Sequence, residues 1–199
     1  MNYPKTILNL IESFKKLPGI GEKTAERLAL STLNMDDDTI ETFSNSLKEV
    51  KKKIKKCDKC GSYTENELCD ICLSETRDHS TMCVVEESKN VIQFEKVGTY
   101  NGVYHVLGGL ISPLDGINPE NINLSTLKKR IKDENIKEVI LAIKPSIEGE
   151  TTALYISKML EGEPIKITKI AHGIPMGADI DYIDPLTLEI AMEDRTTIS

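Results

Sequence analysis

The sequence contains no tryptophan, no internal repeat and no uninterrupted run of about 18 apolar residues. Without such a run we expect no membrane-spanning helix, and the short apolar runs after Lys5 argue against a signal peptide. The composition is otherwise ordinary for a globular protein, with 39% hydrophobic and 29% charged residues. We therefore expect a cytoplasmic protein in which 199 residues form one sizeable domain or two small ones.

A general excess of positive charge is also missing, because the formal net charge is −7. This balance argues against non-specific nucleic-acid binding by the chain as a whole. The charge is unevenly distributed, however: residues 1–56 hold 11 Lys and Arg against 8 Asp and Glu (+3), residues 57–79 hold 2 against 6 (−4), and residues 80–199 hold 12 against 18 (−6). A polyanionic partner should therefore meet the N-terminal third.

Hydrophobic periodicity separates three kinds of segment. Residues 1–56 carry apolar side chains at helical spacing in "ILNLIESF" and "AERLALST", and a third run, "SLKEVKKKIKK", places Leu47, Val50 and Ile54 on one stripe. The periodicity then vanishes in a short cysteine-rich stretch. Beyond it, β-rich runs such as "EVILAI" alternate with helical runs such as "TTALYISKML", which is typical of a parallel sheet with covering helices. The predicted fold class is α+β in several parts: a helical N-terminal segment, a small cysteine-rich module and a C-terminal α/β domain with a mainly parallel sheet.

A glycine-containing turn, "KLPGIGEKTAERLAL", joins the first two predicted helices. Pro18 and Gly19 end the first helix, and Gly21 permits a tight turn before the next one. Such a hairpin leaves backbone N–H groups pointing outward at a helix N-terminus, which suits an anion. Lys23 and Arg27, four residues apart, lie on one exposed face and suit a phosphate backbone read without sequence preference.

The alternative for this turn is a plain helical connection with two solvated basic residues. The full stretch "LPGIGEKTAERL" closely resembles the helix-hairpin-helix motif of DNA-binding proteins. That resemblance favours a DNA-binding role for Lys23, Arg27, Gly19 and Gly21.

The cysteines of "CDKCGSYTENELCDIC" are spaced as Cys57-x2-Cys60-x8-Cys69-x2-Cys72. Two such pairs that converge fit tetrahedral Zn²⁺ held by four thiolates. A pair of disulfides is the alternative, which a reducing cytoplasm disfavours. Four thiolates leave no open position for a catalytic water, so we predict one structural Zn²⁺ that supplies most of the folding energy of this polar stretch. Cys83 lies in an apolar run and is predicted to be a buried small hydrophobe.

Two stretches of the second half carry a further resemblance. "CVVEESKNV" indicates a strand that ends in a carboxylate and turns into a helix, and "LAIKPSIEGETTALYISKML" indicates a later strand, a short loop and another helix. Together they resemble the Toprim domain of topoisomerases, bacterial primases and some nucleases. In catalytic members a glutamate after the first strand is the general acid/base, and an Asp-x-Asp after the later strand holds Mg²⁺. By motif, Glu86 takes the first position and Lys144 and Ser146 take the two aspartate positions, while Glu148 and Glu150 keep an acidic "EGE".

Carboxylates are thus lacking where such a metal site would need them. Mg²⁺ is held by hard oxygen ligands, typically one or two carboxylates with waters, so the lysine and the serine remove most of the attraction. An ammonium about 4 Å from the ion adds repulsion on the order of 4 kcal/mol per pair of unit charges at an effective dielectric of about 20, an upper bound for a flexible side chain. We predict that the loop is an inactive relic kept for its shape and acidic surface, and that the protein is not an enzyme.

The histidines at positions 105 and 172 lie in or beside apolar runs. An imidazole in such a place is more often a packed or hydrogen-bonded core group than a catalytic one. We predict core or hydrogen-bonding roles for both.

The order of these parts resembles the RecR family of recombination mediator proteins. The resemblance covers essentially the whole chain and includes stretches such as "GVYHVLGGLISPLDGI" and "KIAHGIPMG", with one departure at Lys144, where the usual residue resembles asparagine. It implies a helix-hairpin-helix DNA-binding region in residues 1–56, a four-cysteine zinc finger in residues 57–79 and a Toprim domain in residues 80–175. It also implies a C-terminal segment, residues 176–199, that packs on the Toprim domain or on a neighbouring subunit.

The resemblance further implies a non-enzymatic DNA-repair and recombination mediator of the bacterial cytoplasm, associated with the nucleoid. Such proteins act with RecO, and in some pathways RecF, to load the recombinase RecA onto single-stranded DNA covered by single-strand-binding protein (SSB). They bind single- and double-stranded DNA and form homodimers or ring-shaped homotetramers. The acidic surface around Glu86, Glu148 and Glu150 would then offer contacts to protein partners.

Two alternatives stay open from the residues alone. A Mg²⁺-dependent Toprim nuclease would use Glu86 as base with Glu148 and Glu150 as ligands, and it would require measurable cleavage by the natural protein. A pure adaptor would bind a partner protein through its surface while its hairpin never touched DNA.

Overall fold

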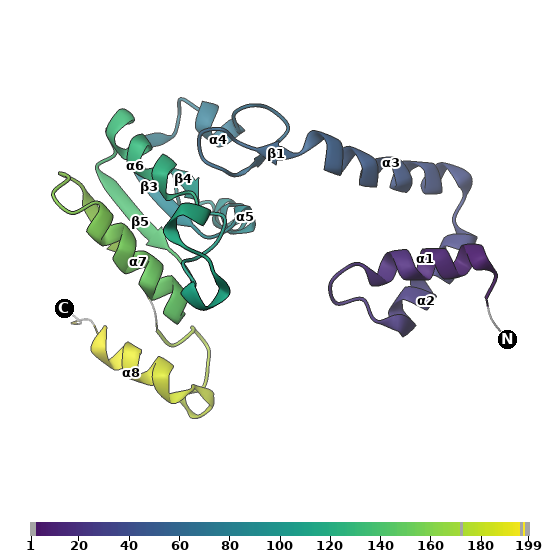
Figure 1. Cartoon of the computed structure of the whole chain (residues 1–199). Coiled ribbons are helices and arrows are strands. Elements are labelled where there is room, and N and C mark those ends of the chain that lie inside the picture. The colour runs from purple at the N-terminus through teal and green to yellow at the C-terminus, as the bar shows by residue number, and fades with distance from the viewer. Residues whose placement is uncertain (1–2, 172, 196, 198–199) are drawn as a thin grey trace. The chain divides into compact units, whose positions relative to one another are not determined.

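The computed structural model describes residues 3–171, 173–195 and 197, and the chain divides into two units, Met1–Ile54 and Lys55–Ser199. The first unit is helical, as the periodicity predicts (Figure 1). Its elements are α1 (Lys5–Lys15), α2 (Glu22–Ser31), the 3-10 turn η1 (Thr32–Asn34) and α3 (Asp37–Lys53).

The small core of the first unit lies between α1 and α2. Ile11, Ala25 and Ala29 are buried, so the alanines let the two helices approach closely. The partly buried side chains packed against these three are Ile7, Leu10, Phe14 and Ile20. The apolar stripes predicted for these two helices therefore face each other.

Helix α3 begins with a side-chain cap and has no buried residue among those described. Asp36 caps its first turn by accepting from the Thr39 N–H at 2.8 Å. The helix ends at Lys53, earlier than the predicted run through Lys56, because Ile54 is extended and the next two residues pair as a strand. The predicted apolar stripe is present, but it is exposed.

The second unit combines a small β-hairpin module with an α/β domain and a C-terminal helix. Its elements are β1 (Lys55–Lys56), β2 (Tyr63–Thr64), α4 (Asp70–Leu73), β3 (Asp78–Val85), α5 (Ser88–Val97), β4 (Gly102–Val106), η2 (Pro113–Asp115), η3 (Pro119–Asn121), α6 (Leu124–Asp133), β5 (Glu138–Ala142), α7 (Ile147–Met159), β6 (Lys166–Lys169), η4 (Ile180–Tyr182) and α8 (Pro185–Glu193).

The larger sheet of the second unit is parallel, with strand order β4-β3-β5-β6. This confirms the predicted α+β class with a parallel sheet. The last residues of three neighbouring strands are in register, since Val85 of β3 pairs with Val106 of β4 and with Ala142 of β5. The residues that follow these strands therefore lie along one edge of the sheet, where α/β domains commonly place functional groups.

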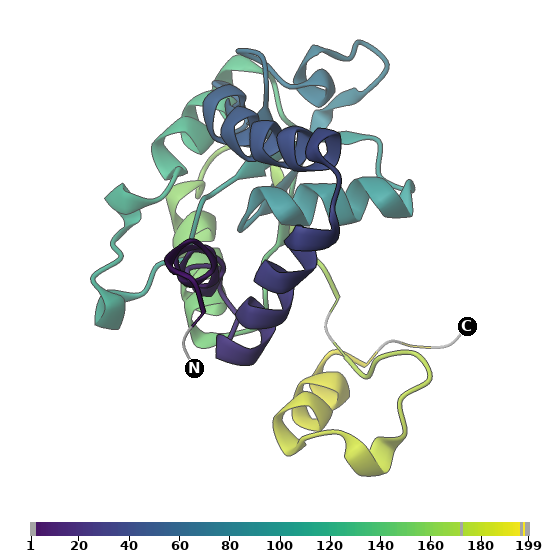
Figure 2. The same ribbon diagram turned by 90° about the vertical axis from the view of Figure 1, so that its right-hand side faces the viewer.

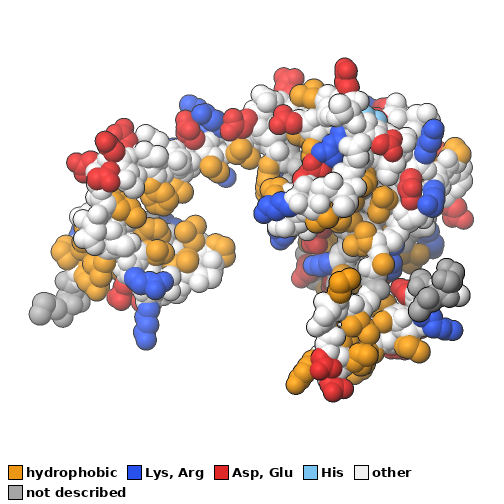
Figure 3. All heavy atoms as spheres, turned by 180° about the vertical axis from the view of Figure 1, so that it is seen from behind, with side chains coloured by type: hydrophobic (Ala, Val, Ile, Leu, Met, Phe, Trp, Pro, Cys, Tyr) orange, Lys and Arg blue, Asp and Glu red, His pale blue; other side chains and the backbone are white. Residues whose placement is uncertain are grey.

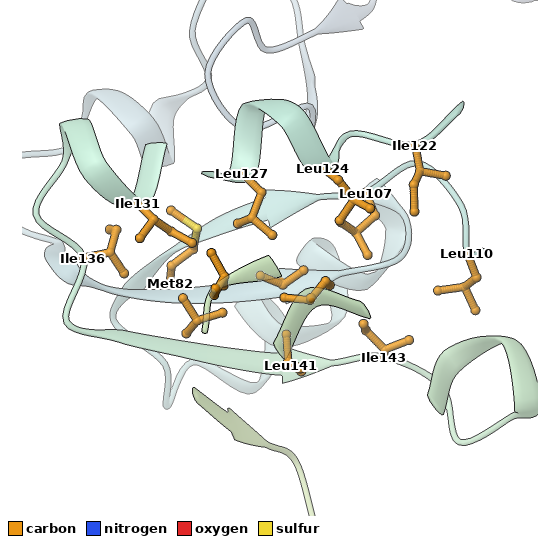
Figure 4. Packing of buried hydrophobic residues seen from close by; sticks show 14 of the residues in the cluster. Met82, Leu107, Leu110, Ile122, Leu124, Leu127, Ile131, Ile136, Leu141 and Ile143 are labelled. Carbon is orange, nitrogen blue, oxygen red and sulfur yellow. The ribbon is translucent and has the colours of Figure 1, made fainter. Parts of the chain in front are cut away.

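Alternate residues of the strands face two separate cores. Met82 and Val84 of β3 point to the side covered by α6 and α7, in a cluster that Figure 4 shows closely packed. Cys83 and Val85 point to the other side, where they pack with Val91 of α5. Helices thus cover both faces of the sheet (Figure 1, Figure 2), and Cys83 is the buried hydrophobe that its apolar run predicts.

The C-terminal part of the second unit is largely exposed. No described residue of α8 is buried, and Leu186 and Met192 expose 63% and 66% of their surface. His172, for which we predict a core or hydrogen-bonding role, lies outside the described residues. Among the residues that are described, no helix is both long and apolar enough to cross a membrane.

Candidate functional site

The turn between α1 and α2 is built around one glycine with a left-handed backbone. Gly19 has φ +79°, a conformation that costs glycine little, and the Ile20 N–H donates to the Leu17 carbonyl at 3.2 Å. Gly21 has an extended backbone and stands at the N-cap of α2. The tight turn therefore depends on Gly19, whereas Gly21 opens the helix end.

The N-terminus of α2 is free of side-chain capping in the described structure. Since the first N–H groups of a helix have no intrahelical acceptor, they face outward for an anion. Lys15 forms ion pairs with Glu12 at 2.8 Å and with Glu22 at 2.5 Å, which tie the two helices together across the turn. These carboxylates raise the pKa of Lys15, and they balance its positive charge within the hairpin.

The two basic residues singled out in the sequence lie one turn apart on α2. Lys23 and Arg27 are both exposed, whereas Ala25 and Ala29 of the same helix are buried. Within the described residues, neither basic side chain has an ion-pair or hydrogen-bond partner. Both charges are therefore available to a ligand outside the chain.

The four cysteines of the second unit converge. Their sulfur atoms all lie within 4.8 Å of one another, all four residues are buried, and Cys60 Sγ is 3.6 Å from Cys69 Sγ. Tetrahedral zinc with Zn–S bonds of about 2.3 Å places its sulfurs about 3.8 Å apart, so the separation fits. The Cys60 thiol donates a hydrogen bond that lowers the pKa of Cys69, which favours the thiolate that a metal needs.

Backbone geometry holds the cysteine module, residues 55–74, in a knuckle. The Cys57 N–H donates to the Ser62 carbonyl at 2.7 Å, and the Gly61 N–H donates to the Cys57 carbonyl at 2.8 Å. The Cys69 N–H points at Cys57 Sγ at 3.3 Å, and the Ser62 N–H points at Cys60 Sγ at 3.4 Å. Such N–H donors stabilise coordinated thiolates.

The knuckle is attached to the end of β4. The Val106 N–H donates to the Cys60 carbonyl at 2.8 Å. Gly61 has φ +78°, and a Cβ there would meet the Val106 carbonyl oxygen at 3.1 Å. The glycine after Cys60 therefore satisfies both a left-handed backbone and a close approach to the sheet.

The loop after β5 does not present a metal-binding pair. Lys144 Nζ lies 3.6 Å from Glu86 Oε1, so the lysine forms an ion pair with the residue that follows β3. Ser146 is the N-cap of α7: its hydroxyl oxygen accepts from the Gly149 N–H at 3.2 Å, and its O–H donates to Glu148 at 2.8 Å. The N-cap role at the start of α7 therefore explains the serine at this position.

The other carboxylates of the predicted partner-binding set are also engaged. The Ser146 hydroxyl is the main cause of the lowered pKa of Glu148. Glu150 accepts from Lys169 Nζ at 3.1 Å through both oxygens. The three glutamates thus lie near the carboxyl edge of the sheet with local donors or cations beside them.

A buried polar network that the sequence does not reveal links the knuckle to the sheet. Arg130 of α6, only 4% exposed, donates to Glu134 at 2.8 Å and to the Tyr104 carbonyl at 2.8 Å. Glu134 also pairs with Lys59, between two zinc-site cysteines, at 3.1 Å. Burial would raise the pKa of Glu134, but the cations Arg130 and Lys59 lower it overall.

His105 completes this network and is fully buried. Its Nε2 donates to the Asn123 carbonyl at 2.6 Å, which leaves Nδ1 as the acceptor for Arg130 at 3.2 Å. Burial lowers the pKa of His105 to about 4, so the ring is neutral. The predicted core role of His105 is confirmed. For the pairing of Arg130 with Glu134, the sequence offered one signal, which is their i, i+4 spacing on a helix.

Family models match consecutive parts of the chain. They are described as the helix-hairpin-helix of RecR for residues 7–51, the four-cysteine zinc finger domain of RecR for residues 54–74, the Toprim domain for residues 80–171 and the C-terminal part of RecR for residues 173–196. A relative named Recombination protein RecR, from Staphylococcus haemolyticus (strain JCSC1435), is 51% identical over 196 residues, which are 98% of this chain and 99% of that protein.

The zinc-finger match agrees with the geometry of the thiols. Four buried cysteines converge at spacings that suit tetrahedral coordination, and the same stretch matches a model of a four-cysteine zinc finger. The knuckle is therefore a site for one structural Zn²⁺, with all four positions taken by protein sulfur.

Proposed function

The chain belongs to the RecR family, and from that premise we propose that it is a non-enzymatic mediator of DNA repair and recombination. It binds DNA and, with RecO and in some pathways RecF, promotes loading of RecA onto single-stranded DNA covered by SSB. It acts in the bacterial cytoplasm, where it is associated with the nucleoid. The observation that carries the non-enzymatic part is the Lys144 ammonium, which stands beside Glu86 where a Toprim enzyme would need a metal ligand.

DNA binding is assigned to the hairpin of the first unit. The open N-terminus of α2 suits a phosphate, and Lys23 and Arg27 are exposed and unengaged within the described residues. Residues 1–56, which contain the first unit, also carry a net charge of +3. Contacts of this kind position a phosphate backbone without reading bases, so both single- and double-stranded DNA are suitable ligands.

Reversing both hairpin charges should weaken DNA binding. For the double variant Lys23→Glu, Arg27→Glu we expect affinity for gapped DNA to fall about 100-fold and the slope of log K against log salt to become shallower by about 2. Anisotropy of labelled DNA over a salt series measures both quantities. The matched control is Lys128→Glu, Lys129→Glu, two exposed lysines of α6 with the same charge change, which should bind nearly as tightly as the natural protein.

The same DNA, recovered after incubation in Mg²⁺, tests the absence of catalysis. Intact strands on a denaturing gel are the expected result. Cleavage that disappears with Glu86→Ala would contradict the mediator and favour the nuclease. A hairpin variant that keeps the natural affinity and salt slope would remove the assignment of DNA binding to α2 and favour the pure adaptor.

Self-association is assigned first to α3. Its apolar residues follow alternating spacings of three and four, the seam of a coiled coil, and expose between 36% and 63% of their surface. These residues are Ile40, Phe43, Leu47 and Val50. Acidic side chains occupy the first turn of the helix and lysines the last turn, so an antiparallel second copy would place opposite charges together.

A single charge in this seam should weaken the homodimer. For Leu47→Asp we expect the dissociation constant of self-association to rise at least about 100-fold, because a carboxylate would be buried without a partner. Asn45→Asp, on the opposite side of the same helix, is the control and should leave association unchanged. Light scattering coupled to size-exclusion chromatography separates the two cases, and equal masses for the two variants would contradict a role of α3.

The C-terminal segment, residues 176–199, is assigned to a second contact. A hollow of about 730 Å³ lies between α7 and α8 and is lined by the apolar side chains of Ile147, Leu154, Leu186 and Ile190. Figure 3 shows hydrophobic side chains at the surface of both units. Two different self-contacts would allow a ring-shaped homotetramer. The acidic group Glu86, Glu148 and Glu150 would then form the surface that contacts RecO.

A further inference from the structure

An exposed tyrosine and a lysine are cross-strand neighbours on the β1–β2 hairpin. The two strands are antiparallel, and Lys56 is directly opposite Tyr63, so both side chains lie on the same face of the hairpin. Tyr63 exposes 59% of its surface, and Lys56 is exposed as well. Within the part of the chain that the structure describes, neither side chain makes a hydrogen bond, and Lys56 forms no ion pair. An aromatic ring and a cation are therefore both available to a ligand.

The pair lines a hollow of about 280 Å³ between the hairpin and the parallel sheet. Buried Val106, at the end of β4, and buried Ser88, at the start of α5, also line it. A Cβ on Gly108 would lie 3.8 Å from Lys56 Nζ, so the ammonium reaches across the hollow to the sheet. Pockets that take drug-sized ligands measure about 300–1,000 Å³, so this hollow suits a smaller group such as a single nucleobase.

The charge of the hollow favours an anion. Glu87 supplies the one carboxylate among its lining residues, and this carboxylate is paired with Lys89 at 2.6 Å. The ion pair leaves the positive charge of Lys56 unbalanced. A phosphate can therefore approach Lys56 beside the ring of Tyr63 without meeting an unpaired carboxylate in the hollow.

The cysteine knuckle holds the ring in place. The residue before Tyr63 is Ser62, whose carbonyl accepts from the Cys57 N–H at 2.7 Å and whose N–H points at Cys60 Sγ at 3.4 Å. The carbonyl of Gly61 accepts from the Ser88 hydroxyl at 3.4 Å, which ties the same loop to α5. A group that is already ordered loses less conformational entropy on binding, so it gains affinity from preorganisation.

On the basis of the proposed DNA-binding function, we propose that Lys56 and Tyr63 form a contact site for single-stranded DNA. One base stacks on the Tyr63 ring, and a neighbouring phosphate meets the Lys56 ammonium. Every base has a flat face, so such stacking tolerates any sequence. In a duplex the bases are already stacked on one another, so the ring finds no free face. The site thus distinguishes single strands from duplex, which phosphate contacts at Lys23 and Arg27 do not.

Anisotropy with zinc-loaded full-length protein tests this, using a labelled oligothymidine and a labelled duplex of the same length. Tyr63→Ala should lower affinity for the single strand about tenfold and affinity for the duplex less than about twofold. Tyr63→Phe keeps the ring and should bind like the natural protein. Lys56→Gln should make the slope of log K against log salt shallower by about 0.7 on the single strand. Tyr155→Ala, which removes an exposed tyrosine of α7, is the matched control and should change neither affinity.

A photocrosslink reads the stacking directly. An oligothymidine in which 5-iodouracil replaces one base should, on irradiation in the complex, become attached to the peptide that carries Tyr63. Tyr63→Leu keeps an apolar side chain without a ring, so it should lose this crosslink, and it replaces Tyr63→Ala if that variant fails to retain zinc.

The outcomes separate the stacking site from DNA binding itself. Unchanged single-strand affinity in both ring-less variants would overturn the stacking site, as would an equal loss on single strand and duplex or a crosslink that survives Tyr63→Leu. Each of these results leaves DNA binding at the hairpin of the first unit intact. A natural protein that bound neither form of DNA would instead overturn the proposed function and the stacking site together.

Discussion

Replacing Cys60 by serine is expected to abolish zinc binding and unfold the knuckle. The core of this module consists of four cysteines, with Leu68 and Ile71 only partly buried against them. Apolar burial therefore contributes little, and the metal supplies the folding energy; structural zinc in finger peptides binds with roughly 10–16 kcal/mol of apparent free energy. That exceeds the roughly 0.5–3 kcal/mol of an ordinary substitution.

Zinc content per chain and hydrogen exchange measure this effect. We expect zinc to fall from one ion to nearly none, and amide protection to be lost in the knuckle and at Val106, whose N–H donates to the Cys60 carbonyl at 2.8 Å. The β3 and β5 amides should stay protected because their core is separate. A variant that kept one zinc ion and a protected Val106 amide would contradict the structural role.

Cys83→Ala is the matched control for loss of a thiol. Cys83 lies in β3, and burial raises the pKa of its thiol to about 12, so it is neutral and behaves as a small apolar group. Removing it should leave the zinc content unchanged and cost little stability.

Replacing Glu134 by alanine is expected to destabilise the second unit by about 3–5 kcal/mol. The carboxylate balances Arg130, which is buried, and also pairs with Lys59 of the knuckle. Without it, the guanidinium keeps the Tyr104 carbonyl as an acceptor but loses its counter-charge in a place that water reaches poorly. A buried unpaired charge is among the most costly single changes in a protein.

The double variant Arg130→Met, Glu134→Leu tests whether the loss of stability comes from the unpaired charge of Arg130. Removing both partners together should recover part of the lost stability, because apolar groups of similar volume replace the ion pair, while the Tyr104 carbonyl and His105 Nδ1 lose the donor that Arg130 provides. Chemical denaturation of zinc-loaded protein gives the free energies of unfolding. Lys132→Ala on the same helix removes an exposed pair with Glu163 and should change stability by less than about 1 kcal/mol. A Glu134→Ala variant no less stable than Lys132→Ala would show that the network is not stabilising.

Local patterns in the sequence predict much of this structure. The spacing of four cysteines predicts the zinc site, since four thiolates can converge from two short loops. The alternation of β-rich and helical runs predicts a parallel sheet, since parallel strands require crossover helices. The alanine and leucine spacing in α2 predicts its buried face, and the exposed positions of Lys23 and Arg27 follow from it.

Interactions between distant segments are what the sequence does not reveal. Lys59 meets Glu134, and Glu86 meets Lys144, across 75 and 58 positions of the chain, through the strand order of the sheet. Residue type alone also does not show which glycine of the hairpin has a left-handed backbone; Gly19 has it and Gly21 does not. The end of α3 at Lys53 likewise depends on pairing of the following residues with β2.

The two edges of the parallel sheet are guarded against aggregation in different ways. At β6, charged residues Lys166 and Lys169 are exposed and discourage pairing with another strand. At β4, every residue is buried, and part of the cover is the zinc knuckle, whose Cys60 carbonyl takes the Val106 N–H. Protection is therefore permanent at one edge and conditional on metal supply at the other. A chain made in a zinc-starved cell would expose an apolar strand edge. Such a chain would aggregate with other chains as well as lose its own fold.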